Sequence, residues 1–411
     1  MAKNSGAKNF IGIYISPREI CMAQTRLAGS ARLEPEHLVH IPTDFPAKSG
    51  LLRPLSLNND FFSEKAAWVG ALQTAIGKVD WSASRAVVTL SPQFSILRYF
   101  VMPAVDKRFW NKSIPIESRK YIPVSFDEVV YDFSTCLLDG GKKLGVLFGL
   151  TQRKSVEFVL NALKAGGVET EAVEIAPCSL ERLFSFLDPQ EHASKGYVHF
   201  SGSVSHTLFS NHGFPVLYRE TDYETSTTLS ETRRLDLKGA VQFVDRFGGS
   251  EYKQLMLSGD AAEVWKATAL RESPMPVNVW EPAAASALKS NASASFFAIG
   301  ASLRGRTQDK AGIDVSGLGA SVRLEKQVEG YARTVTIAVS GFLLLLSLIG
   351  QARVMMLDSS LGGLSSSLSS AAELKDYPSE VIADKVSKMK ADAVLLDSLS
   401  ESRDILSVKL H

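Results

Sequence analysis

Short runs of alternating apolar and polar residues occupy the first three quarters of the chain, separated by stretches of helical periodicity. Two strand-like runs at 10–15 and 20–24 predict a hairpin. The same pattern predicts strands at 85–90, 96–103, 129–137, 143–151 and 170–175, and helices at 66–76 and 154–165. A new strand pair at 196–201 and 207–211 then restarts the order. Two α/β halves in series indicate a duplicated, two-lobed architecture.

One segment breaks this pattern, because residues 334–352 carry no charge between Arg333 and Arg353. At a rise of ~1.5 Å per residue, a helix of this length spans roughly 28 Å, close to the hydrocarbon thickness of a bilayer. A buried core helix is the alternative, but such a helix normally shows a polar face. We therefore predict a single transmembrane helix. Its hydrophilic residues, Thr336, Ser340, Ser347 and Gln351, share one narrow stripe, which suggests packing against a second membrane helix. The alternative is that the stripe has no packing role, because small and hydroxyl residues are common in membrane helices.

The charges beside this segment predict its orientation. Arg323, Lys326 and Arg333 precede it closely, whereas Arg353 is the one cation that follows it before Lys375. Because Lys and Arg are enriched on the cytoplasmic side, the N-terminal part is expected in the cytoplasm. The expected plan is a cytoplasmic domain at 1–310, a basic, Gly-containing linker at 311–333, the membrane helix at 334–352 and a periplasmic tail at 353–411.

The tail predicts an association surface. Gly and Ser at 361–370 predict a flexible or weakly helical exit from the membrane. A better helix then carries a 4-3-4-3 apolar seam, formed by Ile382, Val386, Met389, Ala393 and Leu396. The seam suits a partner helix or, because it is shorter than three heptads, packing on the globular domain of a partner. The last residues, 405–411, alternate like a strand that has no second strand nearby, so we expect a strand donated to a partner or an incomplete outer domain.

Composition excludes several classes of protein. The 411 residues hold 45 Lys and Arg against 44 Asp and Glu, which gives no electrostatic basis for binding nucleic acid. The 3 cysteines, Cys21, Cys136 and Cys178, are too few and too far apart for a disulfide framework or a metal site. No G-x-S-x-G, HExxH, Walker A or CxxC motif occurs, and we expect neither catalytic residues nor a metal.

The order of three segments resembles the PilM family of actin-like type IV pilus assembly proteins and the related GspL protein of type II secretion. These segments are 119–133 (RKYIPVSFDEVVYDF), 146–177 and 298–305 (AIGASLRG). The resemblance covers roughly residues 8–306. It implies an α/β, actin/FtsA-like two-lobed ATPase fold with ribonuclease H-like halves and a small inserted α/β subdomain at about 97–152. A membrane helix joined to such a domain is similar to GspL, or to a PilM protein fused to the start of its bitopic partner PilN; residues 395–411 resemble the start of the PilN outer domain.

In an actin-like fold, Mg-ATP lies between the lobes on two loops that each supply an Asp and glycines. In this chain Tyr14 replaces the first Asp and Ser16 a glycine, while Pro17 removes an N–H donor. His199 replaces the second Asp, and the adenosine-side glycines are reduced to Gly259. We therefore expect a degenerate nucleotide site without hydrolysis or a cofactor. Residual metal-free nucleotide binding at Ser16, Ser201, Gly202 or Gly259 is the alternative to their roles as turn residues.

The expected function is a non-enzymatic inner-membrane scaffold of a type IV pilus or type II secretion system. By resemblance, its partners are a GspE/PilB-like assembly ATPase and GspM/PilN/PilO-like bitopic proteins, and the chain forms a homo- or heterodimer. An FtsA-like, nucleotide-binding protein that polymerises is the alternative, and a sugar-kinase-like enzyme is a third, weaker one. Both need the acidic residues that this chain lacks.

Overall fold

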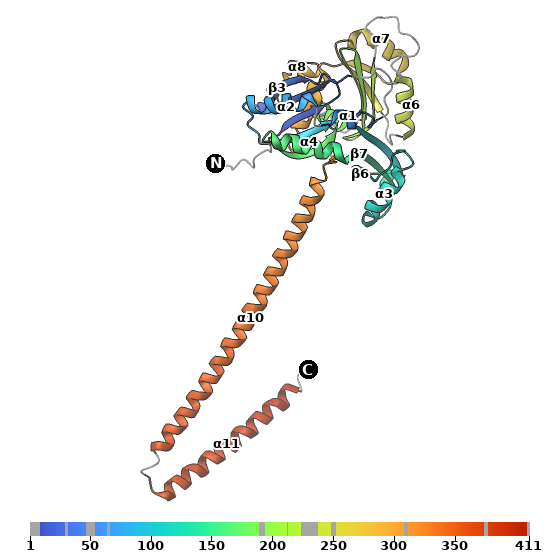
Figure 1. Cartoon of the computed structure of the whole chain (residues 1–411). Helices are drawn as coiled ribbons and strands as arrows, with labels where there is room; N and C mark the ends of the chain where they lie inside the picture. Colours follow the sequence, from blue (N-terminus) through green and yellow to red (C-terminus); the bar gives the residue numbers. More distant parts are fainter. Residues whose placement is uncertain are drawn as a thin grey trace. The chain divides into compact units, whose positions relative to one another are not determined.

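The computed structural model describes residues 9–28, 32–46, 54–63, 66–188, 194–211, 213–222, 237–247, 252–307, 311–373 and 377–408 (Figure 1). The chain divides into two compact units, Met1–Arg323 and Leu324–His411. The first unit holds all three sheets, and the second holds most of two long helices.

Two five-stranded sheets with the same strand order build the first unit. One runs β3 (Arg32–Pro42), β2 (Glu19–Ala28), β1 (Ile11–Ile15), β4 (Arg85–Leu90) and β8 (Glu169–Ile175). The other runs β11 (Phe214–Asp222), β10 (Val204–Asn211), β9 (Ser194–Ser201), β12 (Tyr252–Gly259) and β13 (Val277–Val279). In each sheet the first three strands are antiparallel and the last three are parallel. The repeated topology confirms the predicted duplication.

A third, antiparallel sheet interrupts the first half. Its order is β5 (Ser95–Pro103), β7 (Lys143–Gln152) and β6 (Val129–Leu138). The short helices η1 (Lys107–Phe109), α3 (Trp110–Ser118) and η2 (Asp139–Gly141) accompany it. A separate apolar core that includes Ile114, Leu144 and Phe148 lies under this sheet. The sheet and its helices extend from Ser95 to Gln152, and the insertion was predicted at about 97–152.

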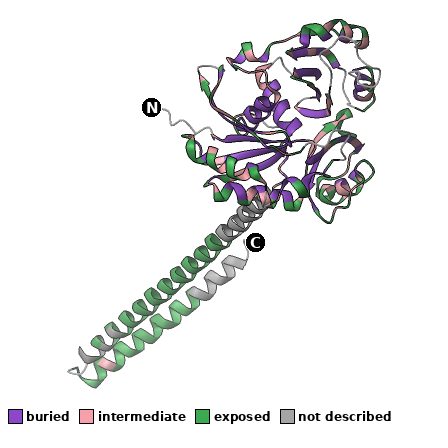
Figure 2. Ribbon diagram, turned by 45° about the horizontal axis from the view of Figure 1, so that its top comes forward, coloured by how far each residue is buried: buried purple, intermediate pink, exposed green. Residues whose placement is uncertain are grey.

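The remaining helices flank the two large sheets or follow them. They are α1 (Asn58–Phe61), α2 (Ala67–Lys78), α4 (Arg153–Ala165), α5 (Ala176–Leu187), α6 (Leu237–Phe247), α7 (Ala262–Glu272), α8 (Pro282–Ser286), α9 (Ser293–Ser302), α10 (Leu318–Glu373) and α11 (Ser379–Val408). Figure 2 shows buried residues filling the sheets and adjoining helices of the first unit. The described side chains of α10 and α11 are almost all exposed.

Helix α9 lies at the centre of the first unit because two glycines let backbone approach backbone. A Cβ atom at Gly12 of β1 would lie 1.9 Å from the carbonyl oxygen of Ala298. A Cβ atom at Gly300 would lie 2.0 Å from the carbonyl oxygen of Ser179 on α5. Both distances are far shorter than any real contact, so only glycine permits α9 to cross β1 and α5 in this way.

Three sequence predictions in the second part of the chain are wrong. Residues 318–333, expected in a linker, and 361–370, expected to be flexible or weakly helical, belong to the continuous helix α10. Within α10, the hydroxyls of Ser360 and Ser367 donate to carbonyl oxygens four residues earlier, at Met356 and Gly363, so these polar groups are satisfied without ending the helix.

The strand expected at 405–411 is also wrong as far as Val408, because α11 continues to that residue. A lone strand would leave its backbone N–H and C=O groups without partners, whereas continuation of a helix pairs them. Residues 409–411 lie outside the described residues.

Candidate functional site

The two positions that lack the expected carboxylates both pack against α9. The Tyr14 ring on β1 stacks on the Phe297 ring, with centroids 4.6 Å apart. The His199 ring on β9 packs against the neighbouring Phe296 ring at 4.7 Å. Phe296 and Phe297 are buried, so consecutive side chains of one helix contact the central strand of each half. An apolar contact therefore lies where a metal-binding pair was sought.

The polar atoms of His199 are fully engaged. Its Nε2 lies 2.6 Å from the carbonyl oxygen of Asn291, which identifies Nε2 as a donor. Its Nδ1 lies 2.9 Å from Ser258 Oγ and accepts from that hydroxyl. Burial lowers the pKa of His199 to about 4, so the ring is neutral at pH 7. A neutral, doubly hydrogen-bonded imidazole has no lone pair left for a metal ion or water.

A second buried histidine reinforces this environment. His206 on β10 lies 2.8 Å from the Tyr218 hydroxyl, which donates to Glu220 Oε1 at 2.8 Å. Burial lowers the pKa of His206 to about 3. Burial also raises the pKa of Tyr14 well above its ordinary value, so that phenol stays neutral. The two histidines and Tyr14 are therefore neutral at pH 7 and offer no charge to Mg²⁺, and the carboxylate beside them, Glu220, accepts the hydrogen bond of the Tyr218 hydroxyl.

The serines of the two loops are tied into local structure. Ser16 Oγ donates to the carbonyl oxygen of Glu19 at 2.8 Å, closing the β1–β2 turn. Ser201 Oγ accepts from the backbone N–H of Ser293 at 3.1 Å, at the start of α9. The structure thus brings the second loop to α9 and closes the first loop on itself.

The two loop glycines have conformational roles. Gly202 has φ +60° in the β9–β10 turn, and its N–H donates to Asp260 at 3.4 Å. Gly259 has φ +87°, and a Cβ atom there would lie 1.9 Å from the carbonyl oxygen of Phe200. Both need the left-handed backbone region, which accounts for glycine without a phosphate. Among the described residues, no group of three His, Cys, Asp or Glu side chains could hold a metal ion.

One arrangement that the sequence did not reveal has the outline of a hydrolase triad. His40 Nε2 lies 3.1 Å from Ser295 Oγ, and His40 Nδ1 lies 3.1 Å from Glu19 Oε2. Ser295 is fully buried, however, and the Sγ of buried Cys21 lies on the same side of the ring, 3.8 Å from Nε2. A hydroxyl closed off from solvent cannot attack a substrate, so this chain of contacts anchors α9 to β2 and β3.

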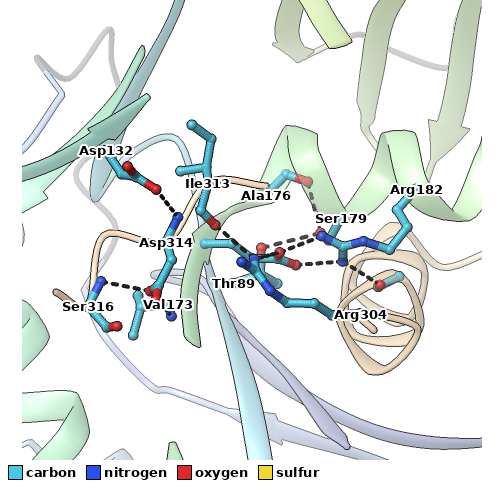
Figure 3. A network of polar contacts seen from close by, with 12 residues as sticks. Thr89, Asp132, Val173, Ala176, Ser179, Arg182, Arg304, Ile313, Asp314 and Ser316 are labelled. Atoms are coloured by element: carbon cyan, nitrogen blue, oxygen red, sulfur yellow. Dashed lines mark hydrogen bonds and ion pairs between the residues drawn. The ribbon is translucent and has the colours of Figure 1, made fainter. Parts of the chain in front are cut away.

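The segment by which the chain leaves the first unit is pinned to two sheets (Figure 3). The backbone N–H of Val315 donates to the carbonyl oxygen of Val173 on β8 at 2.8 Å, and Asp314 Oδ1 accepts from the Val173 N–H at 3.0 Å. The N–H of Asp314 donates to Asp132 Oδ2 of β6 at 2.9 Å. Ala311, Ile313 and Val315 are buried. Residues 311–316 are therefore not the free linker that we expected, because their alternating apolar side chains follow the edge strand β8.

A buried ionic network holds the same exit from beneath (Figure 3). Arg182 pairs with both carboxylate oxygens of Glu174, at 2.9 and 2.6 Å, and donates to the carbonyl oxygen of Gly300 on α9. Arg304 Nη1 donates to Glu174 Oε2 at 2.7 Å and to the carbonyl oxygen of Ile313 at 2.8 Å. The carbonyl groups of Gly300 in α9 and Ile313 in the exit segment are thus held by two arginines that share the Glu174 carboxylate. The charges are buried and paired, which makes loss of any one of them costly.

The residues predicted for membrane and tail contacts lie on the two long helices. A window suited to crossing a membrane extends over Val335–Leu364 of α10, and its described side chains are exposed. The stripe Thr336, Ser340, Ser347 and Gln351 lies within it. The seam Ile382, Val386, Met389, Ala393 and Leu396 lies on α11. Apart from half-buried Ile382, the seam is exposed, as an unpartnered surface would be.

Comparison with known proteins shows the fold. The PilM-PilN type IV pilus biogenesis complex is similar, with a TM-score of 0.54, 16% identity, and coverage of 74% of this chain and 100% of that one. The cytoplasmic domain of EpsL, an inner membrane component of the type II secretion system of Vibrio cholerae, has a TM-score of 0.39 and 16% identity, and the match covers 62% of this chain and 83% of that one. A Bacteroides thetaiotaomicron protein with an actin-like ATPase fold and unknown function has a TM-score of 0.38 and 10% identity, and the match covers 68% of this chain and 94% of that one. No family model and no curated protein matches the sequence. The first unit has the actin-like fold predicted from the sequence, with similarity to PilM.

The buried histidines predict a loss of stability in mild acid. An unfolded chain protonates both rings near pH 6.5, whereas the folded chain keeps them neutral down to about pH 4 for His199 and about pH 3 for His206. The free energy of unfolding should therefore fall as the pH is lowered from 6.5 to 4. Urea titrations at pH 8, 6 and 5 measure this. The double variant His199→Gln/His206→Gln should show a shallower decline, and an equal decline would contradict the proposed burial.

The pinned exit predicts local opening when Asp314 is removed. Asp314→Ala deletes the acceptor for the N–H groups of Val173 and Ser316. The opening free energy of residues 311–316 should drop by about 1–3 kcal/mol, and their amides should exchange faster with deuterium. The matched control is Asp127→Ala, since Asp127 is an exposed carboxylate bound to the Ser125 hydroxyl. Equal exchange in the two variants would show that the side chain of Asp314 does not hold the exit.

Proposed function

We propose that this protein is a non-enzymatic inner-membrane scaffold that couples a cytoplasmic assembly ATPase to membrane and periplasmic components of a type IV pilus or type II secretion system. The observation that carries the proposal is the aromatic packing at the two loop positions, where Tyr14 and His199 pack on Phe297 and Phe296 instead of presenting carboxylates. With a carboxylate missing at both loop positions and both nitrogens of His199 hydrogen-bonded, these two positions cannot supply the ligands that position Mg-ATP or an attacking water. No cofactor is proposed.

The scaffold mechanism follows from how the chain leaves the domain. Residues 311–316 are held by β8, β6 and the Glu174 network, and α10 begins directly afterwards. Positional changes in the domain would thus reach the membrane helix through a short, hydrogen-bonded connection. Cations precede the span and are sparse after it, which supports a cytoplasmic N-terminal unit and an outward tail.

The partners come from the similarity to PilM, whose solved complex contains PilN. A PilN-like bitopic protein is proposed to pair with the seam on α11, and a PilB- or GspE-like ATPase with the first unit. The polymerising, FtsA-like alternative has no supporting observation in the cleft.

Cross-linking in intact cells with an amine-reactive reagent, followed by mass spectrometry, tests this division of labour. Links to the ATPase should map to lysines of the first unit, such as Lys78 and Lys164, and links to a bitopic protein should map to Lys385, Lys388 and Lys390 of α11. The control replaces those three lysines with arginine, which keeps the charge but should abolish only the links at these three positions. Links between the ATPase and α11 would contradict the topology, and absence of any link to the ATPase would contradict the coupling.

A further inference from the structure

The inserted subdomain carries a basic and apolar surface on one side of α3. Between 106 and 121, five cations face two carboxylates, although the whole chain has a net charge of only +1. The cations are Lys107, Arg108, Lys112, Arg119 and Lys120, and all five are exposed. Positive charge is therefore concentrated on this element.

Two large apolar side chains protrude among these cations. Phe109 is 48% exposed and Ile116 is 67% exposed. Their spacing of seven residues, with Lys112 between them, places all three on one face of the helical segment. The opposite face packs on the subdomain core through buried Ile114, with Trp110 beside it. Helix α3 is thus an amphipathic element whose apolar side chains point outward as well as inward.

The two carboxylates leave most of this charge unneutralised. Asp106 pairs with Arg108 at 3.0 Å, and Glu117 pairs with Lys120 at 2.8 Å. In the described part of the chain, no ion pair holds Lys107 or Lys112. Lys107 lies over the Trp110 ring and Arg108 over the Phe109 ring, at 5.8 and 5.0 Å from the ring centroids. These contacts leave the cationic groups beside the apolar side chains, as in helices that bind a membrane surface.

We propose that this surface, formed by Lys107, Arg108, Phe109, Lys112 and Ile116, binds the anionic headgroups of the bilayer in which the chain is anchored. Charge complementarity favours an anionic leaflet, and the exposed Phe and Ile side chains suit insertion at the headgroup boundary. The chain itself raises the effective lipid concentration, because roughly 20 residues separate the pinned exit from the start of the candidate span. The inference rests on the membrane anchoring proposed above.

Helix α7 provides an internal control surface. It also exposes two large apolar residues, Val264 at 60% and Leu270 at 53%. Its charges are balanced, however, with Glu263 and Glu272 against Lys266 and Arg271. A purely hydrophobic attraction to lipid would involve both helices, whereas the proposed attraction involves α3 alone.

Hydrogen–deuterium exchange of the full chain in lipid nanodiscs tests the proposal. One preparation contains phosphatidylcholine alone, and the other contains phosphatidylglycerol mixed with it. Amides of 107–118 should exchange severalfold more slowly in the anionic discs, and 1 M salt should remove the difference because it shortens the screening length to about 3 Å. Lys107→Glu/Lys112→Glu and, separately, Phe109→Ser/Ile116→Ser should also remove it. Val264→Ser/Leu270→Ser on α7 should leave it unchanged.

Each other outcome contradicts the proposal in a distinguishable way. Exchange that is the same in both lipids, in a chain incorporated into the discs, would exclude lipid binding by α3 and leave the scaffold function standing. Protection that appears only after a soluble acidic protein is added would assign the surface to a protein partner instead. A chain that fails to incorporate would contradict both the anchoring and this inference.

Discussion

The contact of α9 with both halves of the first unit is the constraint on which the rest of the structure depends. Gly12 and Gly300 allow the helix backbone to reach β1 and α5, at distances that no other residue would permit. Phe297 then packs against Tyr14, and Phe296 packs against His199. Aromatic pairs of this kind contribute about 0.5–1.5 kcal/mol each beyond their burial. The halves are therefore held together by packing.

The same helix connects these aromatic contacts to the segment by which the chain leaves the first unit. Its Gly300 carbonyl accepts from Arg182, whose partner Glu174 also accepts from Arg304, and Arg304 holds the carbonyl of Ile313. Because these groups are buried and mutually paired, α9, β8 and the segment before α10 behave as one structural unit. This connection is the part of the structure through which the proposed scaffold would transmit position.

Much of the first unit could be predicted from the sequence. Strand alternation located β1, β2 and β4 to β10, and helical periodicity located α2 and α4, because each of these elements has one or two buried faces. The helices α3 and α5 were not predicted. The identities of Tyr14 and His199 were sufficient to question a metal site. The partners of these residues were not predictable, since Phe296 and Phe297 are distant in sequence and look like ordinary core residues of an apolar helix. The pairing of residues 311–316 with β8 was not predictable for a similar reason. Three alternating apolar residues at 311–315 are too short a pattern to distinguish pairing with an edge strand from a linker. The strand predicted at 405–411 is wrong over 405–408 because a short terminal alternation does not outweigh a preceding helix that can continue.

Isothermal titration of the full chain in lipid nanodiscs with Mg-ATP tests most directly whether the site of Tyr14 and His199 binds nucleotide. The aromatic packing at Tyr14 and His199 predicts no saturable, magnesium-dependent heat at micromolar nucleotide and no phosphate release over hours. Micromolar, magnesium-dependent binding accompanied by turnover would contradict it and would return the protein to the class of nucleotide-driven actin-like ATPases.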